Sequence, residues 1–217
     1  MAGKYFFVDT TRCTACRGCQ IACKNWNKQG VSKTTQYGSY QNPSDLDGNT
    51  FRLVRFEEHP SKKNSMVWYF FTEACRHCLK PACQKKADQI KKGAIVVNDF
   101  GAVLFTKKTK ELEKAFKAIK QACPWSIPTW NKKDKQIVKC HMCHDRVTAG
   151  LPTSCSKACP TGALNFGEEA EIKKLANERL AAAKKKFGGK SEILDLEDVR
   201  VLYLVIEEQS KYRPVAI

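Results

Sequence analysis

Twelve cysteines in short, uneven groups constrain this 217-residue chain more strongly than any other feature. The first group reads CTACRGCQIAC, in which two, two and three residues separate successive cysteines. Repeated short spacings of this kind indicate ligation of a metal or cluster, or a framework of disulfides. The groups are Cys13, Cys16, Cys19 and Cys23; Cys75, Cys78 and Cys83; Cys123; and Cys140, Cys143, Cys155 and Cys159.

Three chemistries are open to these thiols. Disulfides suit small secreted domains, but we expect no secretion signal here, and CxxC pairs have poor geometry for bridging each other. Zinc would need a Cys₄ or Cys/His set, for which Cys140, His141, Cys143 and His144 are candidates. The two-two-three spacing is typical of cubane ligation, and twelve cysteines divide into three sets of four. We therefore expect three [4Fe–4S] clusters, with zinc and disulfides as alternatives.

The formal charge of +16 favours a solvated, lysine-rich surface. The lysines are scattered, and no aromatic-flanked basic run or nucleic-acid module accompanies them, so we expect no nucleic-acid partner. Steering toward an acidic redox partner is the alternative use of this charge. No apolar run approaches the roughly 18 residues of a membrane helix, so no membrane span is expected. The start, MAGKYFFVDTTRC, predicts no signal peptide of the chain's own.

The pattern of apolar residues predicts short strands around the cysteine groups and two amphipathic helices. Residues 24–50 are polar, contain glycine and proline, and are expected to be irregular. Pro124 is expected to end the first helix, and Gly188–Gly189 the second. The predicted strands are 4–8, 51–56, 66–71, 94–97 with 102–105 as a hairpin, and 199–206; the predicted helices are 110–122 and 168–187.

The string KCHMCHDRVTAGLPTSCSKACPTGAL resembles the fourth cluster motif of the iron–sulfur subunits that accompany molybdenum and tungsten oxidoreductases. The resemblance implies four motifs, of which the first pairs with the fourth and the second with the third. It also implies an α+β fold made of two fused bacterial-ferredoxin-like (βαβ-type) modules, with added short β-strands and a C-terminal helix and strand. The expected parts are 1–23 with 136–167 around two clusters, 51–135 around one cluster, the excursion 24–50, and the C-terminal region 168–217.

In ferredoxins with two clusters, the fourth cysteine of a run ligates the other cluster. Applied to the implied pairing of motifs, this rule gives three complete ligand sets. The first set is Cys13, Cys16, Cys19 and Cys159; the second is Cys23, Cys140, Cys143 and Cys155; the third is Cys75, Cys78, Cys83 and Cys123.

Relative to that family, four ligand places are missing. Counting by the same spacing, they hold Ala87, Glu113, Phe116 and Ile119, and all four belong to one lost cluster. Phe116 and Ile119 lie on the apolar face of the predicted helix, so hydrocarbon is expected to fill the volume of that cluster. An empty void there would be costly.

In the loss of one cluster, the chain resembles one branch of the family, the small (beta) subunit of soluble tungsten or molybdenum formate dehydrogenases. The stretches VDTTRCTACRGCQIACK, FFTEACRHCLKPACQKKAD and ACPWSIP also carry this resemblance. It implies a non-catalytic electron-transfer subunit. Electrons would pass from a large catalytic subunit, which holds a metal–bis-pterin centre and a further [4Fe–4S] cluster, through the first, second and third sets in turn. The acceptor or donor would be a cytochrome c or a ferredoxin.

Two alternatives to the formate branch stay open. One is the small subunit of a dimethyl sulfoxide, polysulfide or oxyanion reductase, and the other is a free polyferredoxin. By resemblance the complex is expected in the periplasm, exported with a signal-bearing partner, or alternatively in the cytoplasm. The histidines near the cysteines, His77, His141 and His144, are surplus to three cubanes and are expected to form hydrogen bonds around them.

Overall fold

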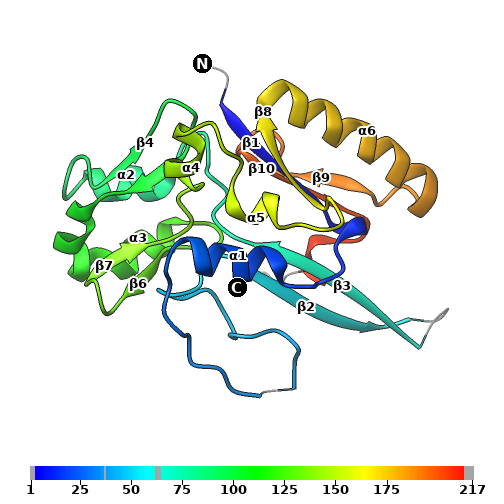
Figure 1. Cartoon of the computed structure of the whole chain (residues 1–217), viewed down its shortest axis with the longest axis horizontal. Helices are drawn as coiled ribbons and strands as arrows, with labels where there is room; N and C mark the ends of the chain where they lie inside the picture. The colour runs from blue at the N-terminus through cyan, green and yellow to red at the C-terminus, as the bar shows by residue number, and fades with distance from the viewer. Residues whose placement is uncertain (1–2, 37, 62–64, 213–217) are drawn as a thin grey trace.

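The structure is a computed structural model, and it describes residues 3–36, 38–61 and 65–212 (Figure 1). Most of its helices and strands are short, and most of the cysteines lie in the connections between them. In chain order they are β1 (Lys4–Asp9), α1 (Gly18–Trp26), β2 (Leu53–Pro60), β3 (Met66–Glu73), α2 (Ala82–Asp88), β4 (Ile95–Val97), β5 (Val103–Phe105), α3 (Phe116–Ala122), β6 (Thr129–Asn131), β7 (Gln136–Val138), α4 (His144–Thr148), α5 (Ser154–Lys157), β8 (Leu164–Glu168), α6 (Glu169–Phe187), β9 (Glu192–Leu194) and β10 (Val201–Val205).

A four-stranded sheet with the order β8–β1–β10–β9 forms the centre of the fold. β1 pairs in parallel with β10 and antiparallel with β8, so the first and last strands of the chain are neighbours. Alternate residues of β1 point to opposite faces, because side chains alternate along a strand. Tyr5 and Phe7 pack with α6 on one face, whereas Phe6 and Val8 face the cysteine-bearing loops. Figure 1 shows α6 lying along one side of this sheet and α1 and α5 on the other.

The C-terminal region is an integral part of this sheet. Every residue of β10 is buried, as expected for a strand covered on both faces. After β10, the side chain of Tyr212 returns to the core, where its ring packs against Tyr69 and Phe71. The predicted tail is therefore anchored as far as Tyr212, and its last residues, 213–217, lie outside the described part of the chain.

The predicted elements are confirmed in kind, and their ends differ by a few residues. The strands at 4–8, 51–56, 66–71 and 199–206 appear as β1, β2, β3 and β10, and the expected hairpin is the antiparallel pair β4–β5. The helix at 168–187 is α6, which ends at Gly188 with φ of 98°. Small sheets mixed with short helices confirm the α+β class. The division into modules stays a prediction, because no observation here tests its boundaries.

The helix predicted over 110–122 is wrong in its first half. Only α3 is α-helical, and residues Lys107–Ala115 form 3₁₀ turns with a non-helical residue at Leu112. Thr109 explains part of the difference, because its hydroxyl donates to the carbonyls of Thr106 (2.8 Å) and Ile137 (3.3 Å). Such bonds compete with the regular helical ladder. The pattern also failed to predict the short hairpin β6–β7 and the strands β8 and β9.

An apolar cluster occupies the region where the family pattern would place a fourth set of ligands. Ala87 and Ile119 are fully buried in it, and Phe116 packs against it from α3. Glu113, the remaining place, is exposed. Among the described residues, no helix is both long and apolar enough to span a membrane.

We predict that Ile119→Ala destabilises the chain by about 2–5 kcal/mol, because it leaves a cavity in this closed apolar cluster. Chemical denaturation of the anaerobically purified protein measures the change. Ile90, which is 55% exposed, provides the matched control, and Ile90→Ala should change the unfolding midpoint little. Equal midpoints for the two variants would show that the cluster is loosely packed.

Candidate iron–sulfur cluster sites

All twelve cysteines are free thiols in the structure, and members of each predicted set lie near one another. The first set shows this most simply. Cys13, Cys16, Cys19 and Cys159 line one narrow pocket, although Cys159 is more than 130 residues further along the chain. Cys19 lies in α1, and Cys159 lies in the loop that leads into β8. Packing of α1 against α5 brings these two segments together.

The second set is buried as a whole. Cys23, at the C-terminal part of α1, meets Cys140 and Cys143 from the β7–α4 connection and Cys155 from α5. Burial first, then the neighbouring thiols of Cys140 and Cys155, raises the pKa of Cys23 well above its usual value. The four sulfur atoms are therefore close enough for their charges to interact.

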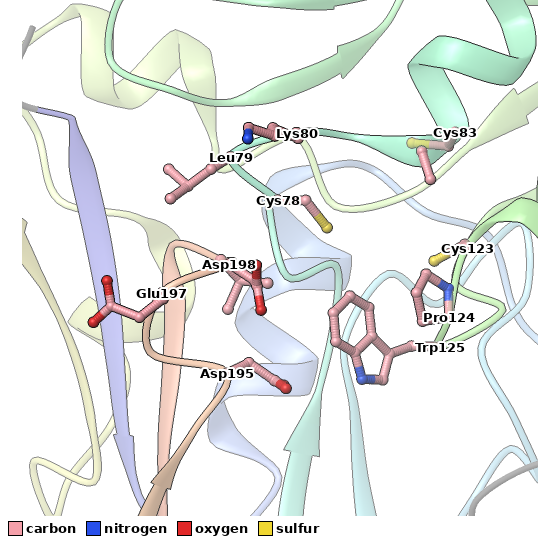
Figure 2. Close-up of a pocket in the computed structure, with 12 residues that line it drawn as sticks. Cys78, Leu79, Lys80, Cys83, Cys123, Pro124, Trp125, Asp195, Glu197 and Asp198 are labelled. Carbon is pink, nitrogen blue, oxygen red and sulfur yellow. The ribbon is translucent and has the colours of Figure 1, made fainter.

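The third set opens onto a cavity of about 460 Å³ (Figure 2). Cys78, Cys83 and Cys123 line it, and Trp125 forms one wall. Burial and the thiols of Cys75, Cys123 and Cys83 raise the pKa of Cys78 to about 12. Cys75 is thus the fourth member of the same group, and it lies deeper in the core.

A local backbone turn recurs in the three loops. The residue two positions after the first cysteine has a positive φ: 53° at Ala15, 50° at His77 and 59° at Met142. Its amide then points back at the cysteine sulfur. The N–H of His77 donates to Cys75 Sγ and the N–H of Met142 donates to Cys140 Sγ, each at 3.4 Å. None of these residues is glycine, so the turn could not be predicted from residue type.

These amides favour the charged form of the sulfur, which is the form that binds metal. At Cys159 the effect exceeds that of burial. Burial raises the pKa of this thiol, but hydrogen bonds from Leu164 and Thr161 outweigh it, and the pKa falls below its usual value. For eight of the thiols, burial is the largest effect and raises the pKa, so these need a bound cation to ionise. They are Cys13, Cys19, Cys23, Cys78, Cys83, Cys123, Cys140 and Cys143.

The three sets lie in a defined order. Cys19 of the first set packs in one buried cluster with Cys155 of the second, and Cys140 of the second packs in another with Cys75 of the third. The second set therefore lies between the other two. Cys16 of the first set is exposed, and three members of the third set are half-buried. The two outer sets reach the surface, whereas the middle set does not.

Two buried cations accompany the sulfurs. Arg52 lowers the pKa of Cys19, Cys23 and Cys140, but burial raises the pKa of each by more. At Cys23, the neighbouring thiols of Cys140 and Cys155 also raise the pKa by more than Arg52 lowers it. Lys139 has the same lowering effect on the pKa of Cys83. The sequence analysis did not identify Arg52. In FRLVRF it shares a strand register with the apolar residues Val54 and Phe56, and that inward position was the available signal.

The predicted surplus histidines take different positions. His77 is fully buried, and its Nδ1 accepts a hydrogen bond from the Val103 amide at 3.1 Å. Burial lowers the pKa of His77 well below its usual value, so the ring is neutral. His141 pairs with Asn27, and His144 is exposed. Among the described residues, no group of three or more His, Cys, Asp or Glu side chains is arranged to hold a single metal ion.

The donor set fits cubane clusters. Each group offers four thiols at a buried or half-buried site, with backbone N–H donors directed at sulfur and with cationic side chains nearby. Thiolate ligands with amide hydrogen bonds and limited access to solvent are the surroundings that hold and tune [4Fe–4S] clusters.

Comparison with known proteins agrees with this chemistry. A family model described as a 4Fe-4S dicluster domain matches residues 66–169. The formate dehydrogenase 2 subunit beta (cytochrome c-553) of Nitratidesulfovibrio vulgaris is 48% identical over 96% of both chains. The formate dehydrogenase subunit beta of Megalodesulfovibrio gigas is 43% identical over 99% of both chains. The formate dehydrogenase-O iron-sulfur subunit of Escherichia coli is 35% identical over 82% of this chain and 57% of its own.

Two of these relatives match this chain over nearly its whole length, and identities of 48% and 43% over that length show that they share its family. The chain therefore belongs to the family of iron–sulfur beta subunits of formate dehydrogenases, as an electron-transfer subunit and not a catalytic one.

Proposed function

We propose that this chain carries electrons between a formate dehydrogenase catalytic subunit and an external redox protein through three [4Fe–4S] clusters. The observation that supports this most directly is the order of the cysteine sets, with a buried set between two sets that reach the surface. A relay needs this arrangement, because its ends must approach partners while its middle is shielded from water.

Each cluster is assigned four thiols under this proposal. Bound cubanes would supply one-electron redox centres. The first cluster is held by Cys13, Cys16, Cys19 and Cys159, the second by Cys23, Cys140, Cys143 and Cys155, and the third by Cys75, Cys78, Cys83 and Cys123.

The count of three rests on the apolar cluster around α3. Ala87 and Ile119 have no exposed surface, and Phe116 packs against Trp130 with ring centroids 6.0 Å apart. No thiol stands at the four places of the lost set, and side chains fill the region. Protein interiors are close-packed, so a fourth cubane would require this cluster to be rebuilt.

The surface around the first set suits a large protein partner. Tyr40 and Trp68 are 62% and 47% exposed, and their rings lie 5.9 Å apart. Tyr40 also contacts Phe56, over which the guanidinium of Arg17 lies at 4.9 Å. Arg17 directly follows the exposed Cys16. Aromatic residues with arginine are typical of protein interfaces, so we assign this face to the catalytic subunit.

That catalytic subunit is proposed to carry tungsten or molybdenum bis-pterin and a further [4Fe–4S] cluster. The third set then faces the external partner, through the cavity lined by Leu79 and Trp125 (Figure 2). The name of the N. vulgaris relative includes cytochrome c-553, which supports a c-type cytochrome as this partner, with a ferredoxin as the alternative. We place the complex in the periplasm, exported by a signal on the catalytic subunit. Cell fractionation tests that location against the cytoplasm.

The first test is chemical analysis of the anaerobically purified protein. We expect about twelve iron and twelve sulfide ions per chain, and electron paramagnetic resonance (EPR) signals of three interacting [4Fe–4S]⁺ clusters after reduction. About sixteen irons would mean that the fourth site is filled. Zinc without labile sulfide would overturn the proposal.

We predict that Cys83→Ala removes the third cluster alone. Iron should fall to about eight per chain, because the other eight ligands are untouched. In the complex, formate oxidation with a small artificial dye should persist, whereas reduction of the natural redox partner should fall at least tenfold. Undiminished reduction of that partner would contradict the role of the third set as the exit.

We predict that Trp68→Glu weakens binding of the catalytic subunit roughly tenfold or more, because it places a charge at the centre of an aromatic interface. Affinity measurements between the two purified subunits provide the readout, with iron content as the check on folding. Phe187 is similarly exposed, at 42%, and lies at the end of α6, so Phe187→Glu is the matched control. Equal weakening by both variants would place the interface elsewhere.

A further inference from the structure

Arg52 is a buried cation whose hydrogen bonds are incomplete. Its side chain is only 1% exposed at the entrance to β2. Nη1 donates to the hydroxyl of Thr72 at 3.0 Å and to the Thr72 carbonyl at 3.3 Å. Nε and Nη2 have no hydrogen-bond partner within the described ranges of the chain. A buried charge is costly unless an opposite charge and further hydrogen bonds compensate it, so this guanidinium needs an anion beside it.

Arg52 lies beside cysteines of two different sets. Its hydrogen-bond partner Thr72 lines the pocket of the first set, and its ring contact Phe6 packs in the buried cluster that contains Cys19 of the first set and Cys155 of the second. The guanidinium therefore lies at the junction between the two sets. Its charge lowers the pKa of Cys19 in the first set and of Cys23 and Cys140 in the second, and it also interacts with Tyr203. With clusters bound, each set of four thiolates and its cubane carries a net charge of about −2.

Two other arginines nearby differ from Arg52 in their surroundings. Arg76 is equally buried, and its guanidinium nitrogens also have no hydrogen-bond partner within the described part of the chain, but they lie over the rings of Tyr203 (4.0 Å), Phe71 (5.0 Å) and Trp125 (5.3 Å). Arg55, three residues further along in β2, forms ion pairs with Asp45 and Glu73. Arg52 has one ring contact, with Phe6 at 5.6 Å, and no ion pair to a carboxylate is recorded for it among the described residues.

We propose that Arg52 is a shared counter-charge for the first and second clusters, with Nε and Nη2 donating to cluster or cysteine sulfur. The inference rests on the proposed ligand sets. A fixed positive charge stabilises the reduced, more negative state of a cluster, so Arg52 raises the reduction potential of both clusters together. It thereby keeps two successive steps of the relay close in energy. Arg52 acts as a positioning and tuning residue and not as a ligand.

The test is an EPR-monitored redox titration of the holoprotein, bound to its catalytic subunit, carrying Arg52→Met or Arg52→Gln. Both variants should keep the iron and sulfide content of the parent. At a fixed potential, the ratio of reduced to oxidised first and second clusters should fall about tenfold, which corresponds to about 59 mV for a one-electron couple. The third cluster, identified by the signal that disappears in Cys83→Ala, should not shift.

Two further variants separate charge from structure. Arg52→Lys keeps the positive charge, so the reduction potentials of the first and second clusters should stay close to those of the parent protein. Arg12 is exposed and directly precedes Cys13, so Arg12→Met removes an equal charge in water and should change the potentials little, because solvent screens it.

Several results would overturn the inference. One is that Arg52→Met keeps its iron and leaves the reduction potentials unchanged, and another is that the potentials of all three clusters shift equally. A third is that Arg12→Met shifts the potentials as much as Arg52→Met does. The fourth is that Arg52→Lys lowers them as much as Arg52→Met does. Iron loss in both neutral variants would make Arg52 a structural residue instead. A parent protein without three cubanes refutes the proposed function itself, whatever the Arg52 variants do.

Discussion

The fold depends on bringing thiols together that must all ionise in order to bind metal. Burial and the neighbouring sulfurs raise the pKa of Cys78 and Cys83 to about 12, and they raise the pKa of Cys23 well above its usual value. Backbone amides and the cations Arg52 and Lys139 offset only part of this cost. Iron supplies the remaining positive charge, so cluster binding contributes directly to the folding free energy, as in other small metal-binding domains.

The central sheet makes this convergence possible. β1 delivers the chain to Cys13, and β8 begins just after Cys159, so the antiparallel pairing of these strands holds the two ends of the first set together. α6 covers the other face of the sheet and, together with β10, buries Tyr5 and Phe7. The strands thus provide a rigid base. The turns at Cys75 and Cys140 lie outside regular elements, so their backbone amides can be directed at sulfur.

Much of this arrangement could be predicted because ligand spacing is a strong and local signal. The cysteine runs, together with family resemblance, predicted which thiols lie near one another, and short apolar runs predicted β1, β3 and β10. The ligand sets themselves stay a prediction. The features that escaped prediction depend on tertiary contacts. The 3₁₀ turns of residues 107–115 pack against β7, a contact that the apolar pattern does not reveal, and the left-handed turn at Ala15 has no glycine to indicate it. The sequence marks Arg52 only as a cation on the same side of the predicted strand 51–56 as Val54 and Phe56.

The position of Arg52 also explains how the second set can work while it is shielded from water. All four cysteines of the second set are buried, and water, which would otherwise stabilise their charge, has little access to them. A cluster in such surroundings has a low potential, because a low dielectric disfavours the more negative reduced state. Electrons would then stop at the first set. A buried guanidinium between the two sets opposes this effect without admitting solvent, and it acts on both sides of the step at once. Surface lysines cannot replace it, although the chain has many, since salt and water screen them over about 10 Å.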